Sequence, residues 1–328
     1  MSKTAVPRVS IITPSFNQAG FLEQTIQSVF SQNYPNLEYW IMDGGSTDGS
    51  VDIIKKYAHR LAGWVSEKDR GQADAINKGF ARATGEVIAW INSDDYYLPG
   101  AIARAVAELQ KHPGCSLVYS DVVSVDGAGQ PFNVMTYDHW GLDELLQFNI
   151  LGQPGVFMRR SVLEQSGTLD LSYTYLLDHH LWLRVAQVAP VHYVPEQWAA
   201  ARFHAGAKNV AHAALFGQEA LRIAAWIGDQ VTFADRYPRL RRRVWAGAYR
   251  IAGRYLLDSG QPGPALWAYL RSLWWYPPIA LSETRRIFYA FASLFGNVSW
   301  LKQRYLDRRK AGLDRAQRSR SSSEVRKS

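Results

Sequence analysis

The chain has 328 residues, a formal net charge of +8 and a single cysteine, Cys115. This length accommodates one large α/β domain with an appendage, and a single cysteine excludes an internal disulfide. The first thirty residues lack a charged segment followed by an apolar one, so we expect no secretory signal and a cytoplasmic protein. Much of the positive charge lies in the carboxyl-terminal third, in residues 239–243 and 302–327.

Two strand–helix units are expected in the first sixty residues. Residues 9–17, with the sequence VSIITPSFN, are typical of a buried β-branched strand that runs into a proline turn. Residues 21–31 then carry apolar side chains at helical spacing. A second strand is predicted over residues 37–42 and a second helix over residues 51–59. This alternation indicates an α/β sheet.

A glycine-rich turn, DGGSTDGS over residues 43–50, joins the second strand to its helix. Glycine allows a ligand to approach the backbone closely, and Asp43 at the strand tip can accept a hydrogen bond from a base or ribose. Ser46 or Asp48 can instead be the N-cap of the helix. Capping does not explain Asp43, which is therefore a candidate nucleotide contact.

A third unit has a short strand over residues 63–67 and the segment DRGQADAINKG over residues 69–79, a loop that enters a helix. Arg70 and Lys78, close to glycines, suit a diphosphate, because guanidinium is a planar fork and ammonium a point charge. Isolated charges of this kind are more often solvated at the surface. Polar clusters at three consecutive strand ends favour the diphosphate hypothesis for Arg70.

An acidic cluster, NSDD over residues 92–95, follows the fourth predicted strand, EVIAWI over residues 86–91. Adjacent carboxylates at the carboxyl edge of a sheet are costly without a cation, and their hard oxygen ligands suit Mg²⁺ or Mn²⁺. A polar turn over residues 96–100 then precedes a predicted helix over residues 101–111. An aspartate can also cap that helix, so the cluster alone leaves both explanations open.

Four motifs in order carry a family resemblance: TPSFN from residue 13, then DGGSTDGS, DRGQADAINKG and NSDD. Together they resemble the family 2 glycosyltransferases, enzymes of the GT-A fold that use nucleotide sugars and usually invert the anomeric centre. The resemblance is strong over residues 8 to about 100 and continues in looser motifs to residue 204. These are QPGVFMRR from residue 153, LDHHLWLR from residue 177 and ARFH from residue 201.

The resemblance implies that residues of the first three motifs bind the nucleotide sugar. Asp43 would face the base, Arg70 would lie near the diphosphate or the base, and Asp74 would lie near the donor sugar. The residues expected to line the base and ribose pocket are Thr13, Pro14, Ser15 and Asp43.

Asn92, Ser93 and Asp94 occupy the family's D-x-D positions, and Asp95 extends them. The resemblance implies that Asp94 and Asp95 hold the Mn²⁺ or Mg²⁺ that bridges the donor phosphates. Asn92 departs from the pattern, because it replaces the first aspartate and removes one anionic metal ligand. An asparagine at this position is still a reasonable ribose partner.

Asp178 is the residue that the resemblance implies as catalytic base, since the family places an acidic residue before a Leu-Trp-Leu-Arg helix. An inverting transfer needs a carboxylate within hydrogen-bond reach of the acceptor hydroxyl, whose proton it takes. Asp178 can also cap the helix predicted over residues 179–188, and the two roles are compatible.

Three histidines are further candidates. The resemblance implies that His204, after a strand-like stretch over residues 198–203, can approach the metal or the diphosphate, whereas a lone histidine is more often an ordinary polar residue. His179 and His180 lack the cysteine cluster or spaced His-Glu set of a zinc site. We interpret this pair as the acceptor-side wall or as helix surface.

Three more strands are predicted, over residues 117–125 and 156–158 and, as a final edge strand, over residues 192–202. An acceptor-side loop over residues 138–153 precedes the second of them. We expect a GT-A catalytic domain over residues 1–217, a mixed Rossmann-like sheet flanked by helices.

A helical appendage rich in aromatic and basic residues is expected over residues 218–301, followed by a basic, disordered tail over residues 302–328. Charges interrupt its apolar runs before the ~18 residues of a spanning helix, so a transmembrane anchor is not expected. Interleaved aromatics and arginines fit helices at a membrane interface. Packing against the catalytic domain is the alternative, and no motif predicts a nucleic-acid partner.

We therefore predict a metal-dependent, inverting glycosyltransferase that moves a sugar from a nucleotide diphosphate, with UDP as the expected nucleotide. The acceptor would be a hydroxyl of a glycan or lipid-linked glycan. By analogy, a cytoplasmic enzyme at the inner face of the membrane suits bacterial surface polysaccharide synthesis. One alternative is a non-catalytic GT-A-like scaffold that recruits partners to a membrane. The other is a nucleotidyltransferase, which would need a G-x-G-x-R loop that TPSFN lacks.

Overall fold

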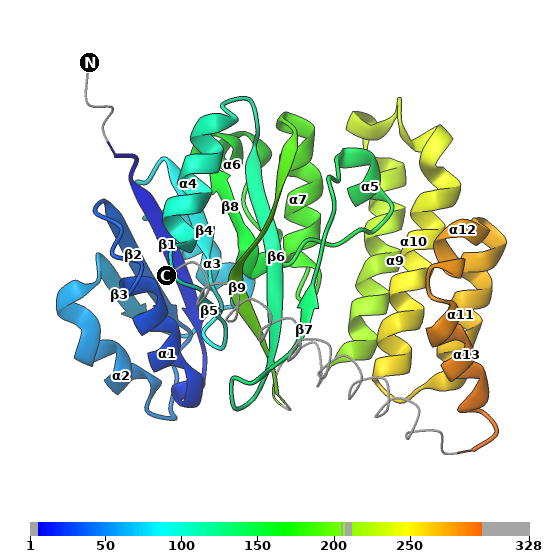
Figure 1. Ribbon diagram of the computed structural model, residues 1–328, viewed down its shortest axis with the longest axis horizontal. Helices are drawn as coiled ribbons and strands as arrows, with labels where there is room; N and C mark the ends of the chain where they lie inside the picture. Colours follow the sequence, from blue (N-terminus) through cyan, green and yellow to red (C-terminus); the bar gives the residue numbers. More distant parts are fainter. Residues whose placement is uncertain (1–5, 205, 207–211, 297–328) are drawn as a thin grey trace, which may run out of the picture.

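The computed structural model describes residues 6–204, 206 and 212–296. Within them, a mixed sheet of nine strands is flanked by helices, and a stack of further helices stands beside it (Figure 1). The strand order is β3-β2-β1-β4-β8-β6-β9-β5, and β7 pairs with β6. The predicted GT-A architecture with a helical carboxyl-terminal region is thereby confirmed.

The amino-terminal units form the parallel part of the sheet. Helices cover both of its faces, which explains why its strands are near-continuous apolar runs. Ile12 faces the core beneath α3, whereas its neighbour Ile11 faces the core beneath α1 and α2. The strands are β1 (Val9–Ser15), β2 (Leu37–Asp43), β3 (Gly63–Ser66) and β4 (Val87–Trp90), and the helices are α1 (Ala19–Phe30), α2 (Ser50–Tyr57) and α3 (Gln72–Phe80).

The second half of the sheet reverses direction. β8 (Val156–Arg159) is antiparallel to β4 and to β6 (Leu117–Asp126), and β7 (Pro131–Met135) is antiparallel to β6. β9 (Val191–Phe203) is parallel to β6 and antiparallel to β5 (Tyr96–Tyr97).

Two predictions for this half were wrong. The expected edge strand at residues 192–202 is an inner strand, because β9 lies between β6 and β5. The polar turn expected over residues 96–100 contains β5, since Tyr96 pairs with Ala200 and Tyr97 with Ala199. This pairing brings the end of β9 to the segment that follows β4.

Helices α4 (Ala101–Lys111), α5 (Leu142–Leu146), α6 (Arg160–Ser166) and α7 (Leu177–Val188) accompany the second half of the sheet. α7 packs against β4, where Trp182 stacks on Trp90 with 5.2 Å between ring centroids. The interpretation of His179 and His180 as surface is wrong, because both are buried. Burial lowers the pKa of His179 to about 3 and that of His180 to about 4, so both are neutral at pH 7.

The carboxyl-terminal helices are α9 (Ala213–Asp229), α10 (Tyr237–Asp258), α11 (Pro262–Trp275), α12 (Pro277–Leu281) and α13 (Thr284–Ala292). α9 therefore begins before the predicted start at residue 218. None of the described helices is both long enough and apolar enough to span a bilayer. The tail predicted over residues 302–328 lies outside the described residues.

The first two of these helices, α9 and α10, pack on the expected catalytic domain, the part of the chain that carries the sheet and α7. Phe216 and Ile223 of α9 and Val244 of α10 belong to the same core as α7. Arg250 of α10 donates to the carbonyl oxygen of Phe148 at 2.9 Å. The alternative that the appendage packs against the catalytic domain is thus correct for α9 and α10.

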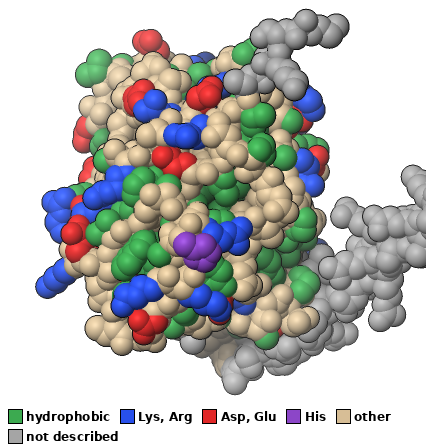
Figure 2. All heavy atoms as spheres, turned by 90° about the vertical axis from the view of Figure 1, so that its left-hand side faces the viewer, with side chains coloured by type: hydrophobic (Ala, Val, Ile, Leu, Met, Phe, Trp, Pro, Cys, Tyr) green, Lys and Arg blue, Asp and Glu red, His purple; other side chains and the backbone are tan. Residues whose placement is uncertain are grey.

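Figure 2 shows the side of the molecule on which β3, β2, α1 and α2 lie in Figure 1. Acidic and basic side chains are interspersed there with apolar ones. Lys56 of α2 and Glu23 of α1 form an ion pair between these two helices at 2.6 Å.

Gly247 tests the contact between α10 and the catalytic part. A Cβ at this position would overlap the carbonyl oxygen of Gln147, which belongs to backbone and cannot easily shift. We expect Gly247→Ala to lower the free energy of unfolding by about 1–3 kcal/mol in urea denaturation, through overpacking. Gly263→Ala is the matched control, because its Cβ would meet only Leu294 at 3.9 Å. Equal stability of the two variants would contradict this contact.

Candidate active site

The polar strand ends predicted from the sequence meet at one edge of the sheet. Ser15 and Asp43 are partners in register at the ends of β1 and β2, and Asp43 and Ser66 are partners at the ends of β2 and β3. Residues 92–95 follow one residue after β4, which pairs with β1. The arrangement is that of an α/β protein with a ligand site outside the carboxyl ends of its strands.

Asp43 is buried and organises the glycine-rich turn. One carboxylate oxygen accepts from the backbone N–H of Gly45 and Ser46 and from the Ser66 hydroxyl, at 3.0, 2.9 and 2.7 Å. The other accepts from the Ser46 hydroxyl at 2.5 Å. The cavity beside Asp43 has a volume of only about 10 Å³.

The capping alternative for this turn was wrong, because Gly49, at φ 98°, is the N-cap of α2. Ser46 and Asp48 instead connect the turn to the loop after β1. The Ser46 hydroxyl accepts from the N–H of Asn17 at 2.8 Å, and the Asp48 carboxylate accepts from the N–H of Ala19 at 2.9 Å. The two loops are therefore held as one unit.

Thr13, Pro14 and Ser15 are buried at the end of β1. The Thr13 hydroxyl is in the core, where it is 2.9 Å from the Tyr39 hydroxyl. The Ser15 hydroxyl is also buried, yet it has no hydrogen-bond partner among the described residues. Ser15 is thus the one of the three with an unsatisfied polar atom at the strand end.

Arg70 and Asp74 are joined across the start of α3. Asp74 accepts from the Arg70 guanidinium at 2.9 Å and from its backbone N–H at 3.1 Å, and Lys78 lies 3.5 Å from the same carboxylate. The bond from Arg70 holds the pKa of Asp74 below its ordinary value. The Arg70 side chain is 73% exposed, so the guanidinium remains accessible to an anion.

The segment of residues 92–95 is fixed by hydrogen bonds within it and by bonds from β9 and α1. Asp95 accepts from the backbone N–H of Arg202 at 2.9 Å and from the Asn92 amide at 3.1 Å. The Thr25 hydroxyl lies 2.9 Å from the carbonyl oxygen of Ser93 and 2.7 Å from that of Asp95. The N-cap of α4 is Gly100, so the explanation of the acidic cluster as a helix cap was wrong.

The two carboxylates of the cluster differ in environment. Burial, and then the charge of Asp94, raise the pKa of Asp95 well above its ordinary value. Asp94 is more open, and one of its oxygens lies 3.1 Å from Nε2 of His204. His204, from just after β9, therefore meets the acidic cluster although the two are far apart in the sequence.

Arg202 is a central residue to which the sequence motifs assigned no role. Its side chain is buried and donates to the carbonyl oxygen of Asp94 at 3.0 Å and to that of Gly127 at 3.0 Å. It also bonds to the Gln24 side chain on α1. The sequence signal that could have identified Arg202 is its position in the ARFH motif, two residues before His204.

Asp178 lies in the first turn of α7 and is partly buried. The capping alternative was wrong, because Leu176 is the N-cap of α7; Asp178 accepts from the N–H of the next residue, His179, at 2.8 Å. Burial raises the pKa of Asp178 to about 6. A carboxylate with such a pKa is suited to accept a proton near neutral pH.

The appendage contributes to the surroundings of Asp178. Glu219 of α9 accepts from three consecutive N–H groups before α7, those of Thr174, Tyr175 and Leu176, at 2.7, 2.8 and 2.8 Å. Burial and the charge of Asp178 raise the pKa of Tyr255 of α10, to about 12. The sequence offered no signal for either residue, because they lie beyond the recognised motifs.

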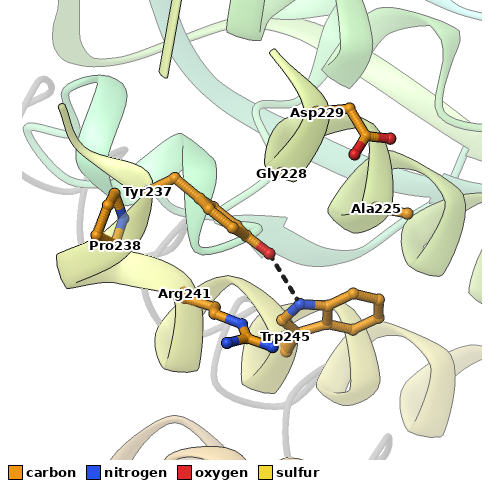
Figure 3. Close-up of a pocket in the computed structure, with 7 residues that line it drawn as sticks. All are labelled: Ala225, Gly228, Asp229, Tyr237, Pro238, Arg241 and Trp245. Atoms are coloured by element: carbon orange, nitrogen blue, oxygen red, sulfur yellow. Dashed lines mark hydrogen bonds between the residues drawn. The ribbon is translucent and has the colours of Figure 1, made fainter. Parts of the chain in front are cut away.

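A groove of about 530 Å³ lies between α9 and α10 (Figure 3). The Tyr237 side chain points across it toward Trp245, whose Nε1–H donates to the Tyr237 hydroxyl at 3.1 Å. None of the predicted site residues lines this groove. Its lining residues are Ala225, Gly228, Asp229, Tyr237, Pro238, Arg241 and Trp245.

Arg202→Lys tests the anchoring role. Lysine keeps the charge but loses the planar fork that reaches several carbonyl oxygens, and these would be left buried without a donor. We expect the free energy of unfolding to fall by about 2–3 kcal/mol in urea denaturation. Arg104→Lys, whose half-exposed side chain pairs with Glu196, should change it by less than about 0.5 kcal/mol. An Arg202→Lys effect as small as that of Arg104→Lys would refute the anchoring role.

The family model of glycosyl transferase family 2 matches residues 10–164. A PGL/p-HBAD biosynthesis glycosyltransferase of Mycobacterium tuberculosis is 32% identical over 182 residues, which cover 53% of this chain and 68% of that protein. The putative teichuronic acid biosynthesis glycosyltransferase TuaG of Bacillus subtilis is 31% identical over 170 residues, which cover 50% of this chain and 66% of that protein.

Solved structures show the same fold at low sequence identity. S. aureus TarS 1-349 in complex with UDP-GlcNAc has a TM-score of 0.53 and 16% identity, with 85% of this chain and 92% of that one covered. The mannosyltransferase PcManGT from Pyrobaculum calidifontis, in complex with GDP-Man and Mn²⁺, has a TM-score of 0.56 and 21% identity, with 88% and 87% covered. The chain spans only 55% of a longer TarS structure. The sequence relatives, the family model and the shared fold agree, and the chain belongs to glycosyl transferase family 2.

Proposed function

We propose that this glycosyltransferase moves a sugar from a nucleotide diphosphate to a hydroxyl of a surface glycan or lipid-linked glycan. The observation that carries the proposal is the meeting of Asp94 and His204 at 3.1 Å, beside the buried Asp95, at the sheet edge that also holds Asp43. Carboxylate and imidazole groups at this edge are the ligands that would hold a divalent cation bound to a diphosphate.

The donor is proposed to lie along the strand ends. Asp43 and Ser15 would contact the base and ribose, with Thr13 and Pro14 offering backbone, and Asn92 and Ser93 closing the ribose side. Arg70 would reach the diphosphate with its exposed guanidinium, and Asp74 would contact the sugar. Because the cavity beside Asp43 is only about 10 Å³, we expect neighbouring side chains to move when a base enters. UDP is the nucleotide we expect, as in the TarS complex.

Asp94, Asp95 and His204 are the proposed ligands for Mn²⁺ or Mg²⁺. Asp94 and His204 already converge, and Asp95 keeps lone pairs beyond its single bonds from Arg202 and Asn92. A cation here would stabilise the negative charge that develops on the departing diphosphate. PcManGT, which shares the fold, is in complex with Mn²⁺ together with a nucleotide sugar.

Asp178 is the proposed general base. As a carboxylate it would take the proton of the acceptor hydroxyl while the oxygen attacks the anomeric carbon from the side opposite the diphosphate, which gives inversion. Glu219 would position it by holding the backbone before α7. The acceptor hydroxyl would enter between Asp178 and the appendage, close to Tyr255.

We propose that α11 and α13, on the acceptor side, face the anionic inner surface of the cell membrane. Exposed apolar residues recur at helical spacing on α11 and again on and after α13, two helices in contact with each other. The exposed Arg271 and Arg285 accompany them, as in helices that lie at a membrane interface. The exposed apolar set, the aromatic face, is Trp267, Leu270, Trp274, Phe288, Phe291, Leu294 and Phe295.

Donor binding can be tested by thermal unfolding with a panel of nucleotides and nucleotide sugars, with and without Mn²⁺. We expect one nucleoside diphosphate to raise Tm only with the metal, because a ligand bound by the native state alone stabilises it. Asp94→Asn and His204→Gln should remove this shift, and Asp52→Asn on the exposed surface of α2 should keep it. The absence of a shift with every nucleotide would point instead to a non-catalytic scaffold.

Asp178 can be tested through nucleoside diphosphate release with the donor so identified. Its carboxylate is the active form, so kcat/KM should fall as the pH drops through about 6 and level off above it. We expect Asp178→Asn to lower kcat by roughly 10²–10⁴-fold. Asp170→Asn, on the exposed approach to α7, should retain the parent rate. An Asp178→Asn enzyme within about fivefold of the parent would remove this residue from the chemistry.

Membrane binding can be measured by co-sedimentation with phosphatidylglycerol vesicles. Replacement of Trp267, Trp274 and Phe288 by serine should weaken binding by at least about tenfold, since each side chain would lose burial in the interface. Val231→Ser, at an even more exposed apolar site outside the aromatic face, is the control. Equal binding of the triple variant would contradict the proposed orientation.

A further inference from the structure

A second group of metal-ligating side chains lies away from the donor site. Glu108 and His112 are one helical turn apart at the end of α4, and His192 is at the start of β9. Arg202, at the donor site, is ten residues further along the same strand, which places the two sites roughly 30 Å apart. None of the three residues has a part in the proposed function.

The three side chains converge on one point. Oε2 of Glu108 lies 3.6 Å from Nε2 of His112 and 3.9 Å from Nε2 of His192. The two imidazole rings face each other, with centroids 3.8 Å apart and planes inclined at 30°. One ligand atom from each residue fits within a mutual spacing of 4.8 Å.

These spacings are slightly wider than those around a bound ion. Tetrahedral ligands at about 2.0–2.2 Å from zinc lie roughly 3.3 Å from one another. His112 is 44% exposed and His192 27% exposed, so both rings can rotate by the small amount required. Lys111 donates to Oε1 of Glu108 at 2.6 Å and leaves Oε2 for the ion.

We propose that Glu108, His112 and His192 bind a borderline divalent cation, with Zn²⁺ as the probe ion, in a site separate from the donor site. Two imidazoles and one carboxylate form a ligand set typical of zinc, with the fourth position left to solvent. His112 is the C-cap of α4, where the helix dipole favours a cation. The ion would tie α4 to the start of β9 and thereby stabilise the sheet.

The test is calorimetric titration of Zn²⁺ into the full chain without a histidine tag. All titrations use the Asp94→Asn background, in which the donor site lacks one of its three proposed ligands. We expect one Zn²⁺ per chain and a higher Tm in its presence. His112→Ala and His192→Ala should each weaken binding by at least about tenfold, since each removes a ligand.

His59→Ala, on the exposed turn after α2, is the control and should bind Zn²⁺ as the parent does. Glu108→Gln, which keeps the side-chain volume, serves as a second test if an alanine variant folds poorly. The absence of saturable binding, or equal affinity in the parent and the two histidine variants, would overturn the proposal. Neither result would affect the proposed transferase activity.

Discussion

The buried guanidinium of Arg202 is the interaction on which the carboxyl edge of the sheet at residues 92–95 depends. A buried charge is costly unless its donors are satisfied, and Arg202 uses them on the carbonyl oxygens of Asp94 and Gly127 and on Gln24. Its backbone N–H holds the Asp95 carboxylate as well. One residue thus joins β9 to the acidic segment after β4 and to α1.

The consequence is that the metal-ligand candidates are set by the register of β5 with β9. Tyr96 pairs with Ala200, so the chain that carries Asp94 meets the end of β9, and His204 arrives beside it. Glu219 has a comparable anchoring function at α7, where it fixes the backbone before Asp178. The appendage is therefore packed into the fold through α9 and α10, while the aromatic face of α11 and α13 stays exposed.

Local patterns predicted the strands and helices of the first hundred residues closely, because buried β-branched runs and helical spacing are local signals. β4 and α4 begin and end within a residue of their predicted bounds. The errors came from long-range pairing. The sequence does not reveal that β9 is an inner strand, that Asp48 binds the loop after β1, or that His179 and His180 are buried.

The candidate site was predicted through motifs rather than through geometry. Motifs give residue types at strand ends. The bond of Asp95 to Arg202, however, joins residues 107 positions apart in the sequence, and the bonds of Glu219 to the backbone before α7 join residues 43 or more positions apart. Such contacts have no local signature. The aromatic content of the carboxyl-terminal third also left open which helices pack and which stay exposed, and the fold divides them between α9–α10 and α11–α13.

The most direct test of this account is a crystal structure with UDP and Mn²⁺, in which anomalous scattering locates the metal. We expect a strong Mn²⁺ peak about 2.0–2.3 Å from Asp94 and His204, bridged to the diphosphate. A nucleotide bound elsewhere, or Mn²⁺ without contact to Asp94, would contradict it.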